Sequence, residues 1–416
     1  MLDMVIRNGI LVTDETNYLP QRGSIGIKDG RIARISLAPA EPPEGTVILD
    51  AEDKIVLPGL INGHCHGDMT LLRGLLDDLT LREQNLAMGK SRWLRDYLTP
   101  RYRLLSRQLT YLEAIKSGTT FITENMYWGL GLDAVRVMKE TGIQGALVLG
   151  VRASFDVQNQ YLPLEELRAF GNCAEENGLL PILGTVAEED FSPGALTEIA
   201  NIAEQLNWLT TQHLAENPWR QELMRERFGT TSIRYLARHG FLHGRMIGSH
   251  AVCADDEEIR LLKQAGVRVV NTPLCEAKIA DGLAPVPQYL KAGIPVGLGT
   301  DGALWNNSND IFREMKGICL LHTLSSGVRT LSHREALRMA TLGGAAVFGL
   351  DHITGSIRVG KRADLILVDT RSAHMRPLRL GSHENVSSSL VYNATGADVS
   401  DSIIGGRLVM RDRTVL

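Results

Sequence analysis

The chain has 416 residues, of which 44% are hydrophobic and 22% charged, and its formal net charge at pH 7 is -4. This length is enough for one large barrel or for two to three ordinary domains, and the composition is typical of a globular protein with a sizeable core. The small negative charge gives no reason to expect nucleic acid or a membrane as a partner.

Five cysteines occur in the chain, an odd number, and no two of them form a C-x-x-C pair. The first residues show no charged segment followed by a long apolar one, and no apolar stretch is long enough to span a bilayer. We therefore expect free thiols and a cytoplasmic location.

Both ends of the chain carry short segments typical of β-strands, separated by glycine-rich and proline-rich turns. These segments are residues 4–12, 24–27, 31–35, 47–49, 363–368 and 399–410. We expect the two ends, residues 1–57 and 351–416, to pair into one small β-sandwich domain.

The middle of the chain, residues 58–350, alternates between apolar runs and stretches with helical periodicity. The apolar runs are residues 121–123, 145–151, 180–186, 208–213, 246–250, 267–271 and 294–300, and the clearest helical stretches are 194–206, 255–265 and 310–324. Regular alternation favours parallel strands, and this many units favour a closed barrel over an open sheet. The predicted fold class is therefore α/β, with a TIM-like (β/α)8 barrel beside the small β-sandwich.

A histidine pair, His64 and His66, directly follows the apolar run at 55–61. In a strand, residues i and i+2 point to the same face, so both imidazoles can reach one metal ion. His213, His250 and Asp301 also lie at or just past the C-terminal end of an apolar run. Barrel enzymes carry their chemistry at that end of the strands, so the pattern indicates a metal-dependent active site.

Longer stretches around these residues resemble the amidohydrolase superfamily, in the branch that holds triazine hydrolases and adenosine-type, guanine and cytosine deaminases. The stretches are Pro58–His66 with residues 69–74, the H-x-x-E segment His213–Glu216, the G-T-D-G-A segment Gly299–Ala303, and residues 355–365 near the C-terminus. The resemblance implies one divalent metal, usually zinc and alternatively Fe²⁺ or Mn²⁺, bound by His64, His66, His213 and Asp301. Three imidazoles and a carboxylate suit zinc and leave a position for water.

The resemblance also implies a hydrolase that acts on carbon–nitrogen bonds other than peptide bonds. Metal-bound hydroxide would attack an amidine-like carbon of an amino-substituted nitrogen heterocycle, and the intermediate would expel ammonia. Asp301 would accept the proton of the water, and His250 would position the hydroxide or stabilise the developing negative charge. Glu216 would protonate a ring nitrogen and then pass a proton to the leaving group.

The expected substrate pocket departs from the family pattern at several positions. Val186 stands where adenosine-type deaminases of this branch have a histidine, and three acids follow at 188–190. In the stretch that corresponds to P-x-S-N-x-K, Cys275 replaces the serine and Glu276 the asparagine. Together with Asp68, these acids would make the entrance of the substrate pocket negatively charged and favour a cationic substrate. Alternatively, residues 188–190 form a solvated loop at a helix N-terminus, where acids are favoured anyway.

Other candidate pocket residues are one arginine and a few aromatic residues. Arg152, at the end of an apolar run, could hold a substrate carboxylate or pair with Glu188 or Asp190. Trp305 could stack on a planar substrate, as could Tyr127 and Trp128, although aromatic residues at strand ends often serve packing alone.

The sequence thus predicts a deaminase with a small-molecule substrate and, by analogy with relatives, a homo-oligomer of two or more chains. The alternative is hydrolysis of a cationic guanidine, formimino or amidine group, or of a cyclic amide. A triazine-type dechlorination is a lesser alternative. A catalytically inactive binding protein is disfavoured, because every expected ligand position is present together with Glu216 and His250.

Overall fold

The computed structural model describes residues 1–13, 19–39, 43–90, 99–126, 131–150, 152–154, 157–160 and 163–416, with the backbone alone over 152–154 and 157–160. Two compact units make up the chain. Unit 1 comprises Met1–Asn62, Leu112–Phe121 and Asp310–Leu416, and unit 2 comprises Gly63–Tyr111 and Ile122–Asn309. The domain boundaries expected after residues 57 and 350 stay predictions.

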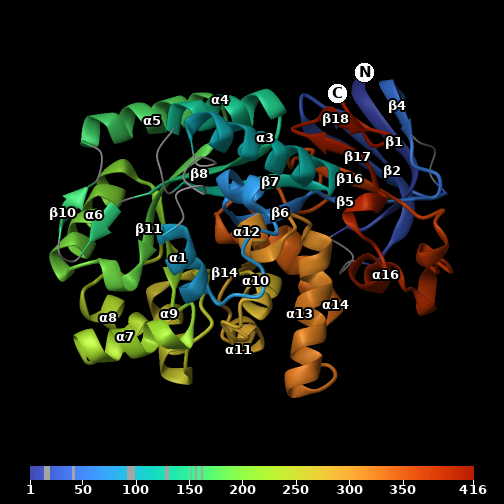
Figure 1. Cartoon of the computed structure of the whole chain (residues 1–416). Helices are drawn as coiled ribbons and strands as arrows, with labels where there is room; N and C mark the ends of the chain where they lie inside the picture. The colour runs from blue at the N-terminus through green and yellow to red at the C-terminus, as the bar shows by residue number, and fades with distance from the viewer. Residues whose placement is uncertain are drawn as a thin grey trace. The chain divides into compact units, whose positions relative to one another are not determined.

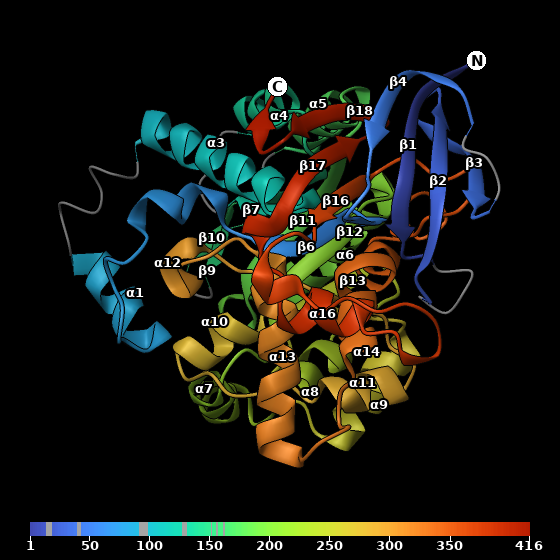
Figure 2. The same cartoon turned by 90° about the vertical axis from the view of Figure 1, so that its right-hand side faces the viewer.

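Strands from both ends of the chain share one nine-stranded sheet in unit 1. Its order is β19-β18-β17-β16-β5-β1-β2-β3, and β4 pairs with β1. The strands are β1 (Leu2–Leu11), β2 (Gln21–Lys28), β3 (Arg31–Leu37), β4 (Gly45–Asp50), β5 (Lys54–Pro58), β16 (Leu365–Asp369), β17 (Val399–Ile404), β18 (Arg407–Arg411) and β19 (Thr414–Val415). In Figure 2 the dark-blue strands of the N-terminal end and the red strands of the C-terminal end belong to this sheet. The expected pairing of the chain ends is confirmed.

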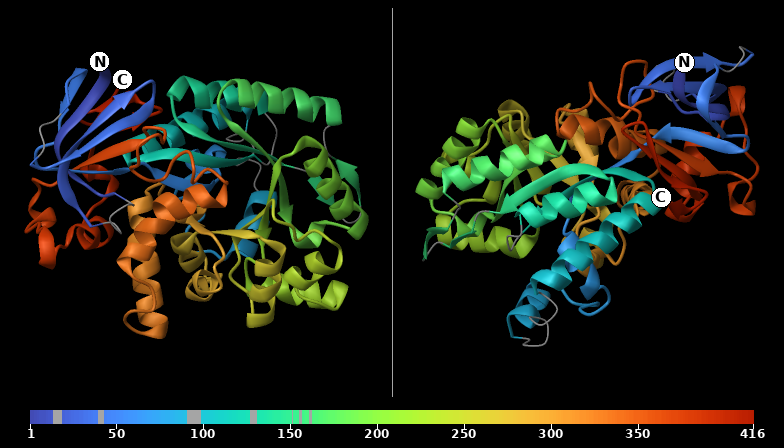
Figure 3. Two further views of the ribbon diagram at one scale, coloured as in Figure 1. Left: turned by 180° about the vertical axis from the view of Figure 1, so that it is seen from behind. Right: turned by 90° about the horizontal axis from the view of Figure 1, so that it is seen from above.

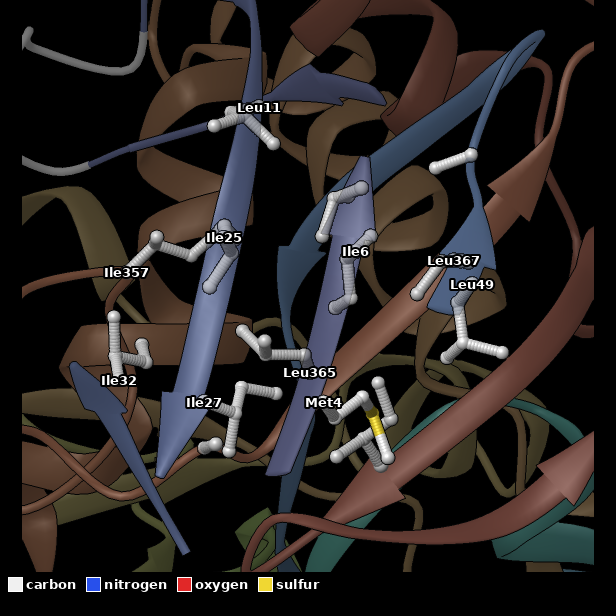
Figure 4. Close-up of a cluster of buried hydrophobic side chains, with 14 residues drawn as sticks. Met4, Ile6, Leu11, Ile25, Ile27, Ile32, Leu49, Ile357, Leu365 and Leu367 are labelled. Carbon is white, nitrogen blue, oxygen red and sulfur yellow. The ribbon is translucent and has the colours of Figure 1, made fainter. Parts of the chain in front are cut away.

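Alternate residues of these strands supply the core of unit 1, because successive side chains of a strand point to opposite faces of the sheet. Fourteen buried side chains form the core cluster, and Figure 4 shows them gathered on one side of the strands. They include three i, i+2 pairs: Met4 and Ile6, Ile25 and Ile27, and Leu365 and Leu367. The expected stretch 399–410 is two antiparallel strands, since Gly405 and Gly406 both have positive φ and turn the chain between them.

The second large sheet has eight strands in the order β6-β7-β8-β11-β12-β13-β14-β15. Its strands are β6 (Leu60–Cys65), β7 (Thr119–Met126), β8 (Gln144–Gly150), β11 (Leu180–Ala187), β12 (Leu209–Leu214), β13 (Met246–His250), β14 (Arg268–Asn271) and β15 (Val296–Leu298). Every pair from β8 to β15 is parallel. The N–H groups of Thr300 and Asp301 donate to the carbonyl of His64, at 3.1 and 3.0 Å, and so join the end of the last strand to the first. The predicted TIM-like barrel is confirmed.

Helices follow most barrel strands, and Figures 1 and 3 show α4 and α5 side by side on the outside of β8 and β11. The α-helices are α1 (Leu81–Lys90), α3 (Pro100–Lys116), α4 (Gly131–Thr141), α5 (Leu164–Glu176), α6 (Pro193–Leu206), α7 (Pro218–Phe228), α8 (Ser232–Arg238), α9 (Asp256–Ala265), α10 (Pro273–Lys278), α11 (Val286–Lys291), α12 (Ala303–Asn306), α13 (Ile311–Ser326), α14 (His333–Arg338), α15 (Gly344–Val347) and α16 (Val386–Tyr392). A short hairpin, β9 (Arg152–Ser154) and β10 (Val157–Gln160), follows β8.

Local signals in the sequence explain where several of these helices begin and end. Helix α9 starts with a capping box, in which Asp255 and Glu258 satisfy each other's backbone N–H groups, and it ends at Gly266 in the left-handed conformation. Helix α7 has Asn217 as its N-cap and proline as its first residue, and it ends at Gly229. The helices expected near 194–206, 255–265 and 310–324 are confirmed as α6, α9 and α13.

All five cysteines are free thiols. Among the described helices, none combines the length and the apolar character needed to cross a membrane.

Replacing Leu365 by alanine should lower the free energy of unfolding by about 2–5 kcal/mol, because the side chain is fully buried and leaves a cavity. Urea denaturation measures the change. The matched control is Leu324→Ala on α13, where the side chain is 86% exposed and little apolar area is lost. Equal effects of the two substitutions would contradict the assigned core.

Candidate active site

Five of the predicted site residues meet at the C-terminal ends of barrel strands in unit 2. His64 is the second-to-last residue of β6, and His66 directly follows that strand. His213 lies in β12, and His250 is the last residue of β13. Asp301 follows β15 by three residues. All five side chains are buried. The barrel therefore brings together residues that are more than 230 positions apart in the sequence.

Four of these residues present donor atoms at the spacing that a tetrahedral metal ion needs. His66 Nε2 lies 3.3 Å from His213 Nε2 and 3.3 Å from Asp301 Oδ1. His64 Nε2 lies 3.5 Å from the same carboxylate oxygen. Two ligands that are each 2.0–2.1 Å from a tetrahedral zinc ion are roughly 3.3 Å apart. The donor set and its spacing thus fit one zinc ion.

The structure offers two overlapping groups of metal donors, which share His64. One group is His64, His66 and Asp301, and the other is His64, His213 and His250. Burial lowers the pKa of His64, His66 and His213, that of His66 to about 3, and a metal binds the neutral form of imidazole. His250 differs, since burial is outweighed by Glu216 and other acids, which raise its pKa to about 9.

Neighbouring polar groups orient the donors. The carbonyl of Asn125 accepts from Nδ1 of His66 at 3.2 Å, which leaves Nε2 as the atom that can bind a metal. Ser249 Oγ lies 2.9 Å from His64 Nδ1. The thiol of Cys275 donates to Asp301 Oδ2 at 2.8 Å, so that Oδ1 faces the imidazoles. Such outer contacts fix the rings and the carboxylate around a metal.

A cavity of about 280 Å³ opens beside the donor atoms. His66, His213, Asp301 and Glu216 line its polar end. The other lining residues are mostly apolar: Met69, Leu81, Asn85, Met88, Val186, Arg220 and Trp305. The indole of Trp305 lies edge-on to His66, with the ring centroids 5.3 Å apart. The cavity thus offers an apolar compartment for a planar ring next to the metal donors.

Glu216 lies between β12 and α7, three residues after His213, and is 4% exposed. Its Oε1 is 3.7 Å from His250 Nε2, and its Oε2 is 3.3 Å from Arg220 Nη1. A carboxyl group in this place can reach both the metal donors and a molecule in the cavity.

Two acids that the sequence assigns to the substrate pocket are not among the described residues that line the cavity. Asp68, in the 3-10 helix η2 (Gly67–Leu72), is fully buried and pairs with Arg107 at 3.2 Å. Glu276 is also fully buried, in α10, and accepts hydrogen bonds from Asn271 and Thr272. The side chain of Arg152 and both aromatic residues 127 and 128 lie outside the described residues.

The acids at 188–190 are not a solvated loop. They form the 3-10 helix η3 (Glu188–Asp190), in which Glu188 is fully buried and Glu189 is 9% exposed. Arg220 Nε lies 3.4 Å from Glu189 Oε1 and supplies a positive charge among these acids. Arg220 was not among the predicted site residues, although its position four residues after Glu216, at the start of a helix, was a signal for an ion pair.

A second missed arginine holds the loop that follows the histidine pair. Arg107, on α3, is fully buried and lies 3.0 Å from Glu124 Oε1 and 3.2 Å from Asp68 Oδ2. Glu124 Oε2 accepts from the backbone N–H of Gly67 at 3.1 Å, and a Cβ at residue 67 would clash with that oxygen. This network holds the backbone directly after His66, and glycine at position 67 leaves room for the carboxylate of Glu124.

Replacing Arg107 by methionine should lower the free energy of unfolding by about 3–5 kcal/mol, because Asp68 and Glu124 would then be buried without a countercharge. We also expect zinc to bind roughly 10–100-fold more weakly, since the loop after His66 loses its support. Urea denaturation and competition with a chelator measure the two effects. Arg136→Met is the control, because that arginine pairs with acids on the surface of α4. A stable Arg107 variant with unchanged zinc affinity would contradict the assigned network.

Comparisons with known proteins agree with this geometry. The family model described as the amidohydrolase family matches residues 55–409. The 5'-deoxyadenosine deaminase of Methanosarcina mazei is 32% identical over 428 residues, which cover 100% of this chain and 94% of the relative. The 5-methylthioadenosine/S-adenosylhomocysteine deaminase of Syntrophobacter fumaroxidans is 34% identical over 433 residues, with 100% and 94% covered.

Among solved structures, an adenosine deaminase from Xanthomonas campestris with bound zinc superimposes with a TM-score of 0.91 at 25% identity, covering 100% of this chain and 94% of that one. The predicted family and enzyme class are thereby confirmed. The chain belongs to the amidohydrolase family and is a hydrolase of carbon–nitrogen bonds, of the deaminase type.

Proposed function

We propose that the chain removes an amino group from a nitrogen heterocycle at one zinc ion held by His64, His66, His213 and Asp301. The observation that carries this proposal is the 3.3–3.5 Å spacing of donor atoms beside a cavity lined by Glu216. Fe²⁺ or Mn²⁺ could use the same imidazole and carboxylate donors.

Zinc, when bound, makes hydroxide available at neutral pH by lowering the pKa of water. Asp301 is the base that accepts the proton of the attacking water, since Oδ1 lies among the donors while Oδ2 is held by Cys275. Glu216 donates a proton to a ring nitrogen of the substrate, and it then carries the proton of the newly added hydroxyl group to the amine, which leaves as ammonia. The proton that Asp301 accepted from the water restores the carboxyl group of Glu216, so both protons of the water are accounted for. His250, through Nε2, stabilises the oxygen that attacks the ring.

Adenosine-type nucleosides are the first substrates to test, because the two relatives described above are deaminases named for substrates of this kind. The lining of Met69, Leu81, Met88 and Trp305 suits the faces of a planar purine-like ring. Val186 also lines the cavity, so contacts with the substrate on that side are apolar.

A cationic guanidine or amidine substrate is the weaker candidate. The acids that favoured it, Asp68 and Glu276, are fully buried in networks with other residues, and Glu189 and Glu216 lie beside Arg220. The described cavity wall thus carries a positive charge as well as a negative one. The cytoplasmic location and the homo-oligomer stay predictions.

Glu216→Gln should lower the turnover of the zinc-loaded chain by about 10²–10⁴-fold, because the amide cannot carry the proton to the ring and the leaving group. Ammonia release from adenosine-type nucleosides, guanine, cytosine, and guanidino and amidine compounds measures the activity. The matched control, Glu222→Gln, changes an exposed carboxylate on α7, the helix that follows Glu216, and should leave turnover unchanged. Near wild-type turnover of Glu216→Gln, or ammonia from cationic compounds alone, would contradict the proposal.

The assignment of ligands predicts different outcomes for two neighbouring histidines. His213→Ala should lose zinc and activity together, whereas His250→Ala should retain zinc and lose most of its activity. Zinc content after dialysis, measured by elemental analysis, separates the two. If His250→Ala lost zinc and His213→Ala kept it, His250 and not His213 would be a zinc ligand, and the proposed ligand set would be wrong.

A further inference from the structure

We infer that Glu276 is a positioning residue, which orients His250 through the hydroxyl group of Thr272. This inference rests on the proposed function for the reaction that His250 serves. Glu276 would then support the catalytic histidine and would not make the contact with a cationic substrate that the sequence led us to expect.

The carboxylate of Glu276 is held rigidly in the interior of unit 2. Asn271 Nδ2 donates to both of its oxygens, at 2.8 and 2.7 Å, and the backbone N–H of Thr272 donates to Oε1 at 3.0 Å. The side chain is fully buried and is not among the described residues that line the cavity. Because its oxygens already accept these bonds from the protein, Glu276 has little capacity left for a substrate.

A chain of hydrogen bonds leads from this carboxylate to His250. Thr272 Oγ1 lies 3.2 Å from Glu276 Oε1 and 2.9 Å from His250 Nδ1. A carboxylate only accepts hydrogen bonds, so the hydroxyl of Thr272 donates to Glu276. The hydroxyl oxygen then accepts the proton on His250 Nδ1. Glu276 Oε1 is itself 3.5 Å from Nδ1, which adds a direct electrostatic attraction.

The opposite ring nitrogen of His250 is aimed toward the reacting groups. Nε2 lies 3.7 Å from Glu216 Oε1, and the ring centroid lies 5.3 Å from that of His213. This Nε2 atom is buried and makes no hydrogen bond with any other residue that the structure describes. It is therefore available to the attacking oxygen, and Glu276 and Thr272 fix its direction before substrate binds.

His250 is the last residue of β13, and its backbone departs there from the extended conformation of a strand. Its backbone is in the left-handed region, with φ at +69°, as is that of Ala251, with φ at +52°. A hydrogen bond on Nδ1 selects one ring orientation, as an acidic partner does for other catalytic histidines.

The direct test uses Glu276→Gln, which keeps the shape of the side chain, and Thr272→Val, which removes the hydroxyl and leaves Glu276 in place. In zinc-loaded protein with ¹⁵N-labelled histidine, NMR should show a slowly exchanging Nδ1 proton on His250, identified by its loss in His250→Gln. We expect this resonance to shift and to exchange faster in both variants.

The kinetic test uses the same two variants. Each should lower kcat roughly 10–100-fold, with unchanged KM and unchanged zinc content, because the supporting contact and not the substrate contact is lost. The double variant should show no further loss, because the two residues act through one chain of hydrogen bonds. Glu258→Gln is the control, since this buried carboxylate binds Arg234 and Thr231 away from the cavity and should change stability alone.

Three results would overturn the inference: an unchanged His250 resonance in Glu276→Gln, a loss expressed in KM with kcat unchanged, or fully additive losses in the double variant. The NMR readout needs no substrate. If wild-type protein released no ammonia from any compound while the resonance responded as expected, the proposed function would fail and the role of Glu276 toward His250 would stand.

Discussion

The active site depends on the closure of the barrel between its last and first strands. The N–H groups of Thr300 and Asp301 donate to the carbonyl of His64, and this contact places the carboxylate of Asp301 against the imidazoles of His64 and His66. Asp301 has a positive φ of +58°, which for a residue other than glycine costs of order 1–3 kcal/mol and persists only where the surroundings enforce it. The hydrogen bonds that close the barrel therefore both position the carboxylate of Asp301 and hold its backbone in this strained conformation.

Around this point, the protein buries several charges and provides each with a partner. Arg107 neutralises Asp68 and Glu124 behind the histidine pair, and Arg220 lies among Glu188, Glu189 and Glu216 beside the cavity. Removal of one member of such a set leaves an uncompensated charge in a low-dielectric interior, which is costly. The arrangement thus ties the segments that carry Asp68 and Glu216 to helices α3 and α7.

The fold, and the meeting of four histidines and Asp301 at one face of the barrel, could be predicted from sequence because their signals are local. Short apolar runs ended by a histidine or an aspartate mark strand ends, and the rule for barrel enzymes then places His64, His66, His213, His250 and Asp301 at one face. The contacts of the acidic residues Asp68 and Glu276 could not be predicted in this way. Whether Asp68 and Glu276 reach the substrate depends on Arg107, which is 39 residues from Asp68, and on the side-chain directions of Asn271 and Thr272. Arg107 lies on a helix whose pattern gave no sign that this residue is buried.

In the proposed site, three imidazoles and the carboxylate of Asp301 hold the metal, and every thiol lies outside the coordination shell. X-ray absorption at the zinc edge of the loaded protein tests this ligand set, because it separates nitrogen and oxygen from sulfur. We expect nitrogen and oxygen ligands at about 2.0–2.1 Å with outer scattering from three imidazole rings. Sulfur at about 2.3 Å would contradict it, since Cys275, whose Sγ lies 2.8 Å from Asp301 Oδ2, or Cys65 would then be a ligand.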